Sequence, residues 1–161
     1  MSKKIALMVA EKPSVAKSIC EFLARGQQMR KFQGKSKYNP IYEFDYPMKV
    51  QSNQIFTLRV TSVLGHIMGL KYPDSCKDWN RTNIEDLFHI QMEKNPIDSS
   101  KQVVKSLQFY SKDIDSLVLW LDCDREGEAI AFDIIDVCRE SVRRNAQLDI
   151  YRAHFSALTY Q

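Results

Sequence analysis

The feature that most constrains the fold is a short apolar run that ends in a cluster of acids. Residues 117–121 carry only apolar side chains, and Asp122, Asp124, Glu126 and Glu128 follow them directly. An uninterrupted apolar run of this length is typical of a strand that is buried on both faces. Carboxylates crowded at its end repel one another and resist desolvation, so we expect a positive charge beside them.

Strand-like and helix-like segments alternate along the rest of the chain. Residues 4–10 predict a buried strand, and residues 12–25 predict a helix with Pro13 in its first turn and Gly26 at its end. The further expected elements are a hairpin or two adjacent strands over 42–63, a helix over 99–113, a strand over 116–124, a helix over 128–144 and a strand over 148–156. Between Gly69 and Ser99 the periodicity is broken, which indicates a long excursion with short helices. The alternation predicts an α/β domain with a mostly parallel sheet.

Length and composition favour one intracellular globular domain. The chain has 161 residues and 44% hydrophobic content, which is enough for a sizeable core. No apolar run approaches the ~20 residues of a membrane span, and Glu11 and Lys12 interrupt the short apolar run near the N-terminus. The four cysteines are far apart and form no CxxC pair, so we expect reduced and mostly buried thiols.

The charge is distributed unevenly. The formal net charge is +3, but residues 1–40 carry a net +7 and the remainder a net −4. A basic N-terminal region beside an acidic cluster suits a polyanion that is bound with the help of a metal ion. It equally suits an ordinary solvated face.

The acidic cluster has the composition of a site for a hard cation. If the strand continues through Asp124, then Asp122 and Asp124 point the same way at its C-terminal end, where open α/β sheets bind ligands. Glu126 would lie in the following turn, Gly127 would be free to adopt a positive φ, and Glu128 would open the helix. Three converging carboxylates predict a site for Mg²⁺ or Mn²⁺.

Two other interpretations of the cluster remain open. It is compatible with a solvated helix start that is rich in acids. It also fits the beginning of a calcium loop, with Asp122, Asp124, Glu126 and Gly127 at positions 1, 3, 5 and 6. That fit fails further on, because position 12 is Asp133 and the preceding segment is strand-like, whereas an EF-hand requires a helix there.

Glu11 and Lys12 follow the first predicted strand. A lone Glu at this position is often only a polar residue that ends a buried run. The C-terminal ends of parallel strands lie on one edge of a sheet, however, so Glu11 could face Asp122 and Asp124, and Lys12 would bring a cation to the same edge.

Four sequence blocks resemble one known family. VAEKPSVAKSI, TSVLGHIMGL, VLWLDCDREGEAIAFDII and YRAHFSALT occur in the order found in the Toprim domain of type IA DNA topoisomerases. The likeness spans Ile5 to Thr159 and is strongest to eukaryotic topoisomerase III. SKYNPIYEFDY resembles its alpha form, whereas LWLDCD is similar to the beta form too. The resemblance implies the Toprim (Rossmann-like) fold, a mostly parallel central sheet flanked by helices with a hairpin insertion.

The resemblance also implies roles for individual residues. Glu11 matches the family's general acid or base at the leaving DNA oxygen, and Lys12 matches a lysine that contacts the scissile phosphate. Asp122, Asp124 and Glu126, with Glu11 beside them, match the carboxylates that hold Mg²⁺. These roles agree with phosphoryl-transfer chemistry, in which positioning and charge neutralisation carry most of the catalysis.

Three further residues are candidates for DNA contacts. Arg125 either pairs with a neighbouring carboxylate, which is the interpretation we favour, or reaches a phosphate. His66 is either a hydrogen-bonded structural histidine or a residue close to the DNA path, as the family's matching GH block is. Arg152 either contacts the DNA backbone or has an ordinary surface role.

Two segments depart from the pattern common in the eukaryotic members. The chain reads RAHFSALT where RARFSEIT is common, so His154 replaces an arginine and Ala157 a glutamate. Contacts with DNA or with neighbouring domains could differ there. GEAIAF replaces GENI and resembles the bacterial type I enzymes, without consequence for the metal.

The resemblance implies a larger parent enzyme. The family's nucleophilic tyrosine belongs to another domain, and no tyrosine here matches its context, so we expect residues 1–161 to be a single Toprim domain, a fragment that is inactive alone. The implied activity is cleavage and rejoining of single-stranded DNA through a 5′-phosphotyrosine link, with strand passage and decatenation. The implied partners are a RecQ-type helicase, an OB-fold accessory protein and the remaining topoisomerase domains. The implied compartment is the nucleus.

Two alternatives to the topoisomerase function remain. One is another Toprim enzyme, such as a primase or an OLD-type nuclease. The other is a non-catalytic, metal-stabilised DNA-binding module.

Overall fold

The computed structural model describes residues 3–48, 54–78, 80–143 and 147–155. In chain order its elements are β1 (Lys4–Ala10), α1 (Pro13–Ala24), β2 (Arg30–Phe32), β3 (Ile41–Met48), β4 (Gln54–Ser62), β5 (Met68–Lys71), η2 (Asp74–Cys76), η3 (Asp86–Phe88), β6 (Glu93–Pro96), η4 (Asp98–Ser100), α2 (Lys101–Tyr110), β7 (Ser116–Trp120), α3 (Arg125–Ser141) and β8 (Asp149–Arg152). The predicted order of strands and helices is confirmed, with boundaries that differ by a few residues.

The main sheet has the strand order β2-β3-β4-β1-β7-β8. Strands β4, β1, β7 and β8 are parallel, whereas β3 and β2 are antiparallel additions at one edge. The predicted mostly parallel α/β sheet is therefore confirmed. The predicted pairing within 42–63 is also confirmed, because β3 and β4 form an antiparallel pair, although the turn at 49–53 lies outside the described residues.

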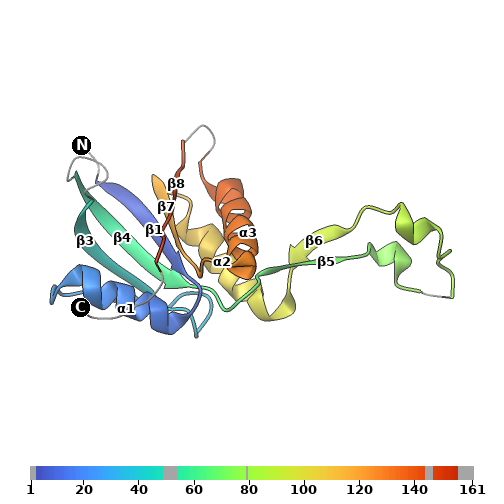
Figure 1. The fold of residues 1–161 in the computed structure, drawn as a ribbon, viewed down its shortest axis with the longest axis horizontal. Coiled ribbons are helices and arrows are strands. Elements are labelled where there is room, and N and C mark those ends of the chain that lie inside the picture. Colours follow the sequence, from blue (N-terminus) through green and yellow to red (C-terminus); the bar gives the residue numbers. More distant parts are fainter. Residues whose placement is uncertain (1–2, 49–53, 79, 144–146, 156–161) are drawn as a thin grey trace.

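Two hydrophobic cores lie on the two faces of this sheet. Leu7 and Val9 of β1 belong to the core under α2 and α3, whereas Ala6, Met8 and Ala10 belong to the core under α1. Successive side chains of a strand point to opposite faces, so this alternation divides β1 between the two layers. Figure 1 shows the same arrangement, with α1 on one face and α2 and α3 on the other.

The first helix ends one residue before the position expected from the sequence. Arg25 already has a left-handed conformation with φ of 46°, and Gly26 follows with φ of 84°. Two consecutive residues with positive φ cannot continue a right-handed helix.

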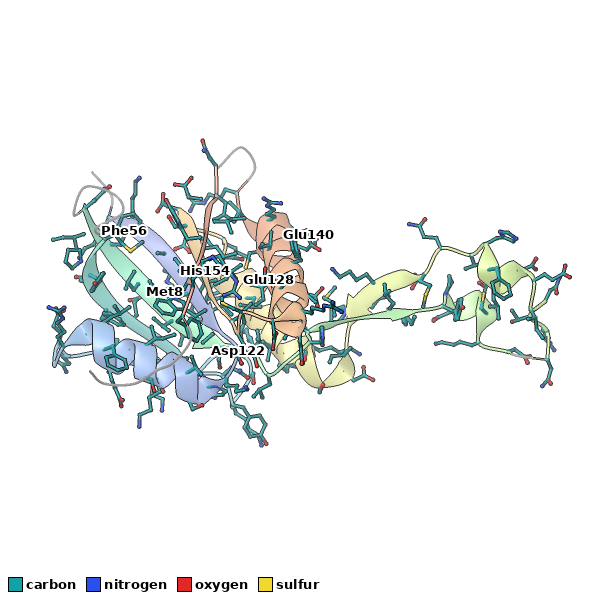
Figure 2. The ribbon with its side chains drawn as sticks, viewed as in Figure 1. Met8, Phe56, Asp122, Glu128, Glu140 and His154 are labelled. Atoms are coloured by element: carbon teal, nitrogen blue, oxygen red, sulfur yellow. The ribbon has the colours of Figure 1, made fainter. Side chains whose placement is uncertain are left out.

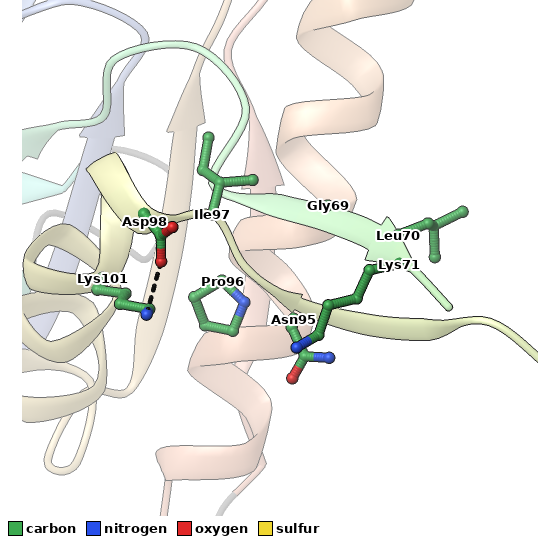
Figure 3. A pocket seen from close by; sticks show the side chains of 8 residues that line it. All are labelled: Gly69, Leu70, Lys71, Asn95, Pro96, Ile97, Asp98 and Lys101. Atoms are coloured by element: carbon green, nitrogen blue, oxygen red, sulfur yellow. Dashed lines mark ion pairs between the residues drawn. The ribbon is translucent and has the colours of Figure 1, made fainter. Parts of the chain in front are cut away.

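The excursion after β4 forms an arm that extends away from the sheet (Figure 1). Its base is the antiparallel pair β5 and β6, which the sequence did not predict, and its distal part contains the short helices η2 and η3, which agree with the prediction. At the base, a hollow of about 480 Å³ lies beside Gly69, Ile97 and the ion pair of Lys101 with Asp98 (Figure 3). The arm exposes Phe88 almost fully, at 83%.

The cysteines are free, and three of the four are buried. Burial raises the pKa of Cys20 and of Cys138 to about 12, so both thiols stay protonated at neutral pH. The expectation of free and mostly buried thiols is therefore confirmed, and Cys123 is the exposed one of the four. No described helix is both long enough and apolar enough to cross a bilayer.

The distal arm is expected to be dispensable for folding, because its described residues, 72–78 and 80–92, contribute nothing to either hydrophobic core. Lys71 and Glu93 are paired across β5 and β6, so Asn-Gly can replace residues 72–92 as a two-residue hairpin turn. We expect the free energy of unfolding in urea to stay the same or to rise by up to about 2 kcal/mol, because the shorter loop costs less entropy to close. The core substitution Ile67→Ala, used as a comparison, should cost about 3 kcal/mol. A similar loss in the shortened arm would contradict this prediction.

Candidate functional site

The site is built where β1 and β7 end side by side. Ala10 is paired with Trp120 in the parallel register, so Glu11 continues directly toward the segment that follows β7. The backbone N–H of Glu11 donates to the Trp120 carbonyl oxygen at 3.2 Å, and Glu11 Oε2 accepts from the backbone N–H of Asp122 at 3.2 Å. The expectation that Glu11 faces the acidic segment is therefore confirmed.

Lys12 supplies the positive charge that the acidic cluster was expected to require. Its Nζ lies 3.1 Å from Glu11 Oε1 and 3.8 Å from Asp122 Oδ2. The hydrogen bond to Glu11, together with the negative charges of Glu11 and Asp122, raises the pKa of Lys12 above its usual value. An exposed ammonium group thus stands between two carboxylates that are 111 residues apart in sequence.

The acidic segment is a helix cap and not the end of a strand. Strand β7 ends at Trp120 and α3 begins at Arg125, so the expected two-residue alternation of Asp122 and Asp124 is wrong. Asp124 is the N-cap residue, and its Oδ1 accepts from the backbone N–H of Gly127 at 2.7 Å. This bond satisfies one of the free donors of the first turn, which explains why the helix starts three residues earlier than expected. Glu126 and Glu128 lie in the first turn, where the helix dipole favours negative charge.

Gly127 is required for a close approach, and not for the positive φ that a glycine is free to adopt. It lies in the first turn of α3 and is buried, and only Gly26 and Gly65 among the described glycines have positive φ. A Cβ atom at position 127 would lie 2.1 Å from the carbonyl oxygen of Asp122. The absence of a side chain therefore lets the acidic segment fold tightly onto the start of the helix.

The carboxylates have the chemistry of a divalent-cation site, but they are not gathered around one point. Asp122, Asp124 and Glu126 are exposed oxygen donors of the kind that Mg²⁺ and Mn²⁺ prefer. Among the residues that the structure describes, no three His, Cys, Asp or Glu side chains converge closely enough to hold a metal. Asp124 is turned toward the helix, and Lys12 contacts Glu11 and Asp122, which accounts for the difference from the expected convergence.

Comparison with known proteins identifies the fold family. The family model for the Toprim domain matches residues 6–158. The chain belongs to the Toprim domain family. It is 47% identical over 152 residues to DNA topoisomerase 3-alpha of Arabidopsis thaliana, which covers 94% of this chain and 16% of that protein.

Two other relatives carry similar names. Identity is 40% over 153 residues to DNA topoisomerase 3-alpha of Homo sapiens, and 39% over 156 residues to DNA topoisomerase 3 of Caenorhabditis elegans. These matches cover 95% and 97% of this chain but only 15% and 20% of the two relatives. The chain thus spans less than a quarter of the length of the relatives it matches.

Arg152 is a positioning residue of this Toprim domain. Its side chain is only 17% exposed. Its guanidinium donates to the carbonyl oxygens of Leu121 at 2.7 Å and Asp122 at 2.8 Å, and to Glu128 Oε1 at 3.0 Å. It therefore ties β8 to the backbone of the acidic segment and to the first turn of α3. These bonds differ from the ordinary surface role that was one of the two expected alternatives, and the other, a contact with the DNA backbone, stays a prediction.

The other two candidate DNA contacts have different surroundings. Arg125 is exposed and makes no ion pair with any residue that the structure describes, so the favoured ion pair is not found. His66 is half-exposed at the base of the arm, with Nδ1 3.9 Å from Asp133 Oδ2. His154, one of the two departures from the family pattern, is exposed, and Ala157 lies outside the described residues.

Asp133 was missed as a structural carboxylate by the sequence interpretation. It is buried on α3, and its Oδ1 lies 2.8 Å from Nζ of Lys94 on β6. The hydrogen bond to Asp133, and a second one to Asp136, raise the pKa of Lys94. Asp133 follows the buried Ile130 by three residues and therefore lies on the apolar face of α3. A carboxylate on that face is the signal in the sequence that could have indicated a buried ion pair. These bonds hold the arm against α3.

Gly127→Ala should destabilise the Toprim domain, although alanine is the better helix former by about 1 kcal/mol. The clash with the Asp122 carbonyl is expected to lower the free energy of unfolding by about 2 kcal/mol. Urea unfolding followed by circular dichroism measures this. Ala129→Gly, at an exposed position of the same helix, should cost only about 1 kcal/mol. A stabilised Gly127→Ala variant would show that the close approach is absent.

Arg152→Lys should loosen the acidic segment, because an ammonium group cannot reach the carbonyls and Glu128 together. We expect a loss of about 2 kcal/mol in the free energy of unfolding. Backbone amide signals of residues 121–128 should also shift in the nuclear magnetic resonance spectrum. Arg139→Lys, at an exposed position in the last turn of α3, is the matched control and should change neither quantity. Equal effects in the two variants would argue against the positioning role.

Proposed function

We propose that this chain is the Toprim part of a type IA DNA topoisomerase, an ATP-independent isomerase that cleaves and rejoins single-stranded DNA. The observation that carries the proposal is the contact between Glu11 and Asp122, which joins the EKPS segment to the DCDRE segment at one edge of the sheet. Further support comes from the Toprim match over 6–158 and from relatives that are named DNA topoisomerase 3.

The proposed roles follow from where the side chains lie. Glu11 is half-buried and transfers a proton to or from the sugar oxygen that leaves the scissile phosphate. Lys12, exposed beside it, contacts the phosphate oxygens, for which its ammonium group is a suitable donor. Arg152 keeps the carbonyls of the acidic segment in place.

Asp122, Asp124 and Glu126, with Glu11 beside them, would hold Mg²⁺ or Mn²⁺. When bound, the ion supplies charge neutralisation at the scissile phosphate. Glu11 and Asp122 are at present bridged by Lys12, so we infer that Lys12 turns from the carboxylates to the phosphate when DNA and the cation bind. The negatively charged phosphate would take the place of Glu11 and Asp122 as the partner of the Lys12 ammonium group.

The nucleophilic tyrosine would belong to another domain of the full-length protein. In this proposal the DNA strand is cut through a 5′-phosphotyrosine link, another strand passes, and the cut strand is rejoined, which allows decatenation. The present chain alone would not cleave DNA. The proposed partners are a RecQ-type helicase and an OB-fold accessory protein, and the proposed compartment is the nucleus.

Mn²⁺ titration of the isotope-labelled chain tests the cation site. We expect backbone amide signals of residues 10–13 and 122–128 to broaden together, and an excess of Mg²⁺ to reverse the effect. Asp122→Asn should abolish the broadening, whereas Asp136→Asn, on an exposed part of α3, should leave it unchanged. Broadening confined to 122–133 with a preference for Ca²⁺ would favour a calcium loop and overturn this assignment.

Glu11→Gln tests the catalytic role in a full-length protein that contains this domain. We expect strand cleavage to fall by about a hundredfold or more, because general acid–base catalysis is lost. Affinity for a single-stranded oligonucleotide should stay the same. Glu21→Gln, at an exposed position of α1, is the matched control and should retain activity. Retained cleavage in Glu11→Gln would contradict the topoisomerase mechanism, and absence of cleavage in the parent protein would favour a non-catalytic DNA-binding module.

A further inference from the structure

A second charged surface lies away from the carboxylates. It consists of three lysines around an exposed aromatic ring, and we name it the basic-aromatic patch: Lys35, Lys105, Phe109 and Lys112. These residues line a shallow hollow of about 510 Å³ together with Gln108, Glu140 and Ser141. The patch brings together the segment before β3, the C-terminal half of α2 and the end of α3.

The segment that carries Lys35 is held firmly against α2. The backbone N–H of Lys35 donates to Ser106 Oγ at 2.8 Å. A Cβ atom at Gly34 would lie 2.9 Å from the Asn39 carbonyl oxygen and 3.1 Å from Ser106 Oγ, so the backbone is packed closely there. Asn39 is itself buried and donates to the carbonyl oxygen of Ser62 at 2.9 Å. Lys35 is therefore presented from a fixed backbone position, which lowers the entropic cost of binding.

Phe109 presents an aromatic ring to solvent. The residue is 54% exposed and lies next to the C-terminal residue of α2. Nζ of Lys35 lies 5.9 Å and Nζ of Lys112 lies 5.8 Å from the ring centroid. Its ring meets Tyr110 edge to face, at 5.1 Å between centroids and an interplanar angle of 84°. The exposed part of the ring is surface on which a flat apolar group can stack.

The lysines of the patch are not neutralised by neighbouring acids. Lys35, Lys105 and Lys112 make no ion pair with the residues that the structure describes. Asp113, next to Lys112, is instead held by Arg59, with Nη1 2.6 Å from Oδ1. Glu140 is the one acid among the lining residues. The surface thus has an excess of positive charge, which favours an anion with several charges.

The patch is separate from the carboxylate site. Figure 2 shows Glu140 at the far end of α3 from Asp122. Helix α3 has 17 residues, which corresponds to roughly 25 Å at 1.5 Å per residue. A ligand at the patch would therefore not occupy the positions of Glu11, Lys12 and the acidic segment.

We propose that the basic-aromatic patch binds single-stranded DNA, with one base stacked on Phe109 and the flanking phosphates at Lys35, Lys105 and Lys112. Stacking on an aromatic ring requires an unpaired base, and lysines follow the backbone without reading sequence. The choice of DNA as the ligand rests on the proposed function. A second contact about 25 Å from the scissile phosphate would hold the strand in register while its ends are being rejoined.

The test measures the affinity of the 161-residue chain for two labelled probes in buffer without divalent cations. One probe is a short oligothymidylate, and the other is an abasic deoxyribose-phosphate strand of the same length. Fluorescence anisotropy gives both affinities. Phe109→Leu should weaken oligothymidylate binding by about fivefold or more and leave abasic binding unchanged, because only base stacking is lost. Phe132→Leu, at an exposed ring on α3, is the matched control and should change neither affinity.

The lysines are tested through the salt dependence. Lys105→Gln should reduce the slope of log affinity against log salt by about 0.7, as one phosphate contact is lost from a single strand. Lys17→Gln, on α1, is the matched control and should leave the slope unchanged. Glu140→Gln removes the acid from the patch and should strengthen binding to both probes. Circular dichroism spectra identical to those of the parent chain establish that the variants are folded.

Three outcomes would overturn the inference. They are equal losses in Phe109→Leu and Phe132→Leu, equal effects of Phe109→Leu on both probes, and an unchanged salt slope in Lys105→Gln. The Mn²⁺ titration described above reports on residues 10–13 and 122–128 in the same chain. A failure at the patch with a retained cation response would therefore reject the patch alone, whereas loss of the cation response would reject the proposed catalytic site.

Discussion

The arrangement of the acidic segment depends on the Arg152 guanidinium. This one group donates to the carbonyls of Leu121 and Asp122 and to the Glu128 carboxylate, so it joins the last strand, the loop after β7 and the start of α3. Carbonyl oxygens that leave a strand lose their ladder partners and require other donors. The guanidinium provides several such donors in a fixed plane, which a lysine cannot reproduce. The carboxylates of the segment can then face solvent while their backbone stays held from beneath.

Parallel pairing gives this segment its partner from the other end of the chain. The register of β1 with β7 places Glu11 beside Asp122, and Lys12 then lies between the two carboxylates. An ammonium group in this position keeps negative charges close together in the absence of another cation. The length of α3 separates two kinds of chemistry, since the carboxylates lie at its start and the hollow of the basic-aromatic patch is lined by Glu140 and Ser141 at its end.

Several features could be predicted from the sequence because the signal is local. Strand β1 was predicted with its observed bounds from an unbroken apolar run. The position of Glu11 beside the acidic segment followed from the parallel topology of the strands. The start of α3 was placed too late because Asp124 caps the helix. The first turn is rich in acids and lacks the spacing of apolar residues by which a helix is recognised in a sequence. Strands β5 and β6 were missed because Gly69 and Pro96 are poor strand formers, and their pairing spans a long insertion. The bonds of Arg152 arise only when distant segments meet.

The exposed thiol of Cys123 makes the acidic segment chemically addressable. It lies between Asp122 and Asp124, whereas the other three thiols are buried and two of them have pKa values of about 12. Thiol-directed reagents that need access from solvent will therefore favour this position. A fluorophore or a paramagnetic group can be attached there without introducing or removing any residue. The unmodified sequence thus contains a site for attaching a reporter group, one residue away from each of two carboxylates on which the proposed chemistry depends.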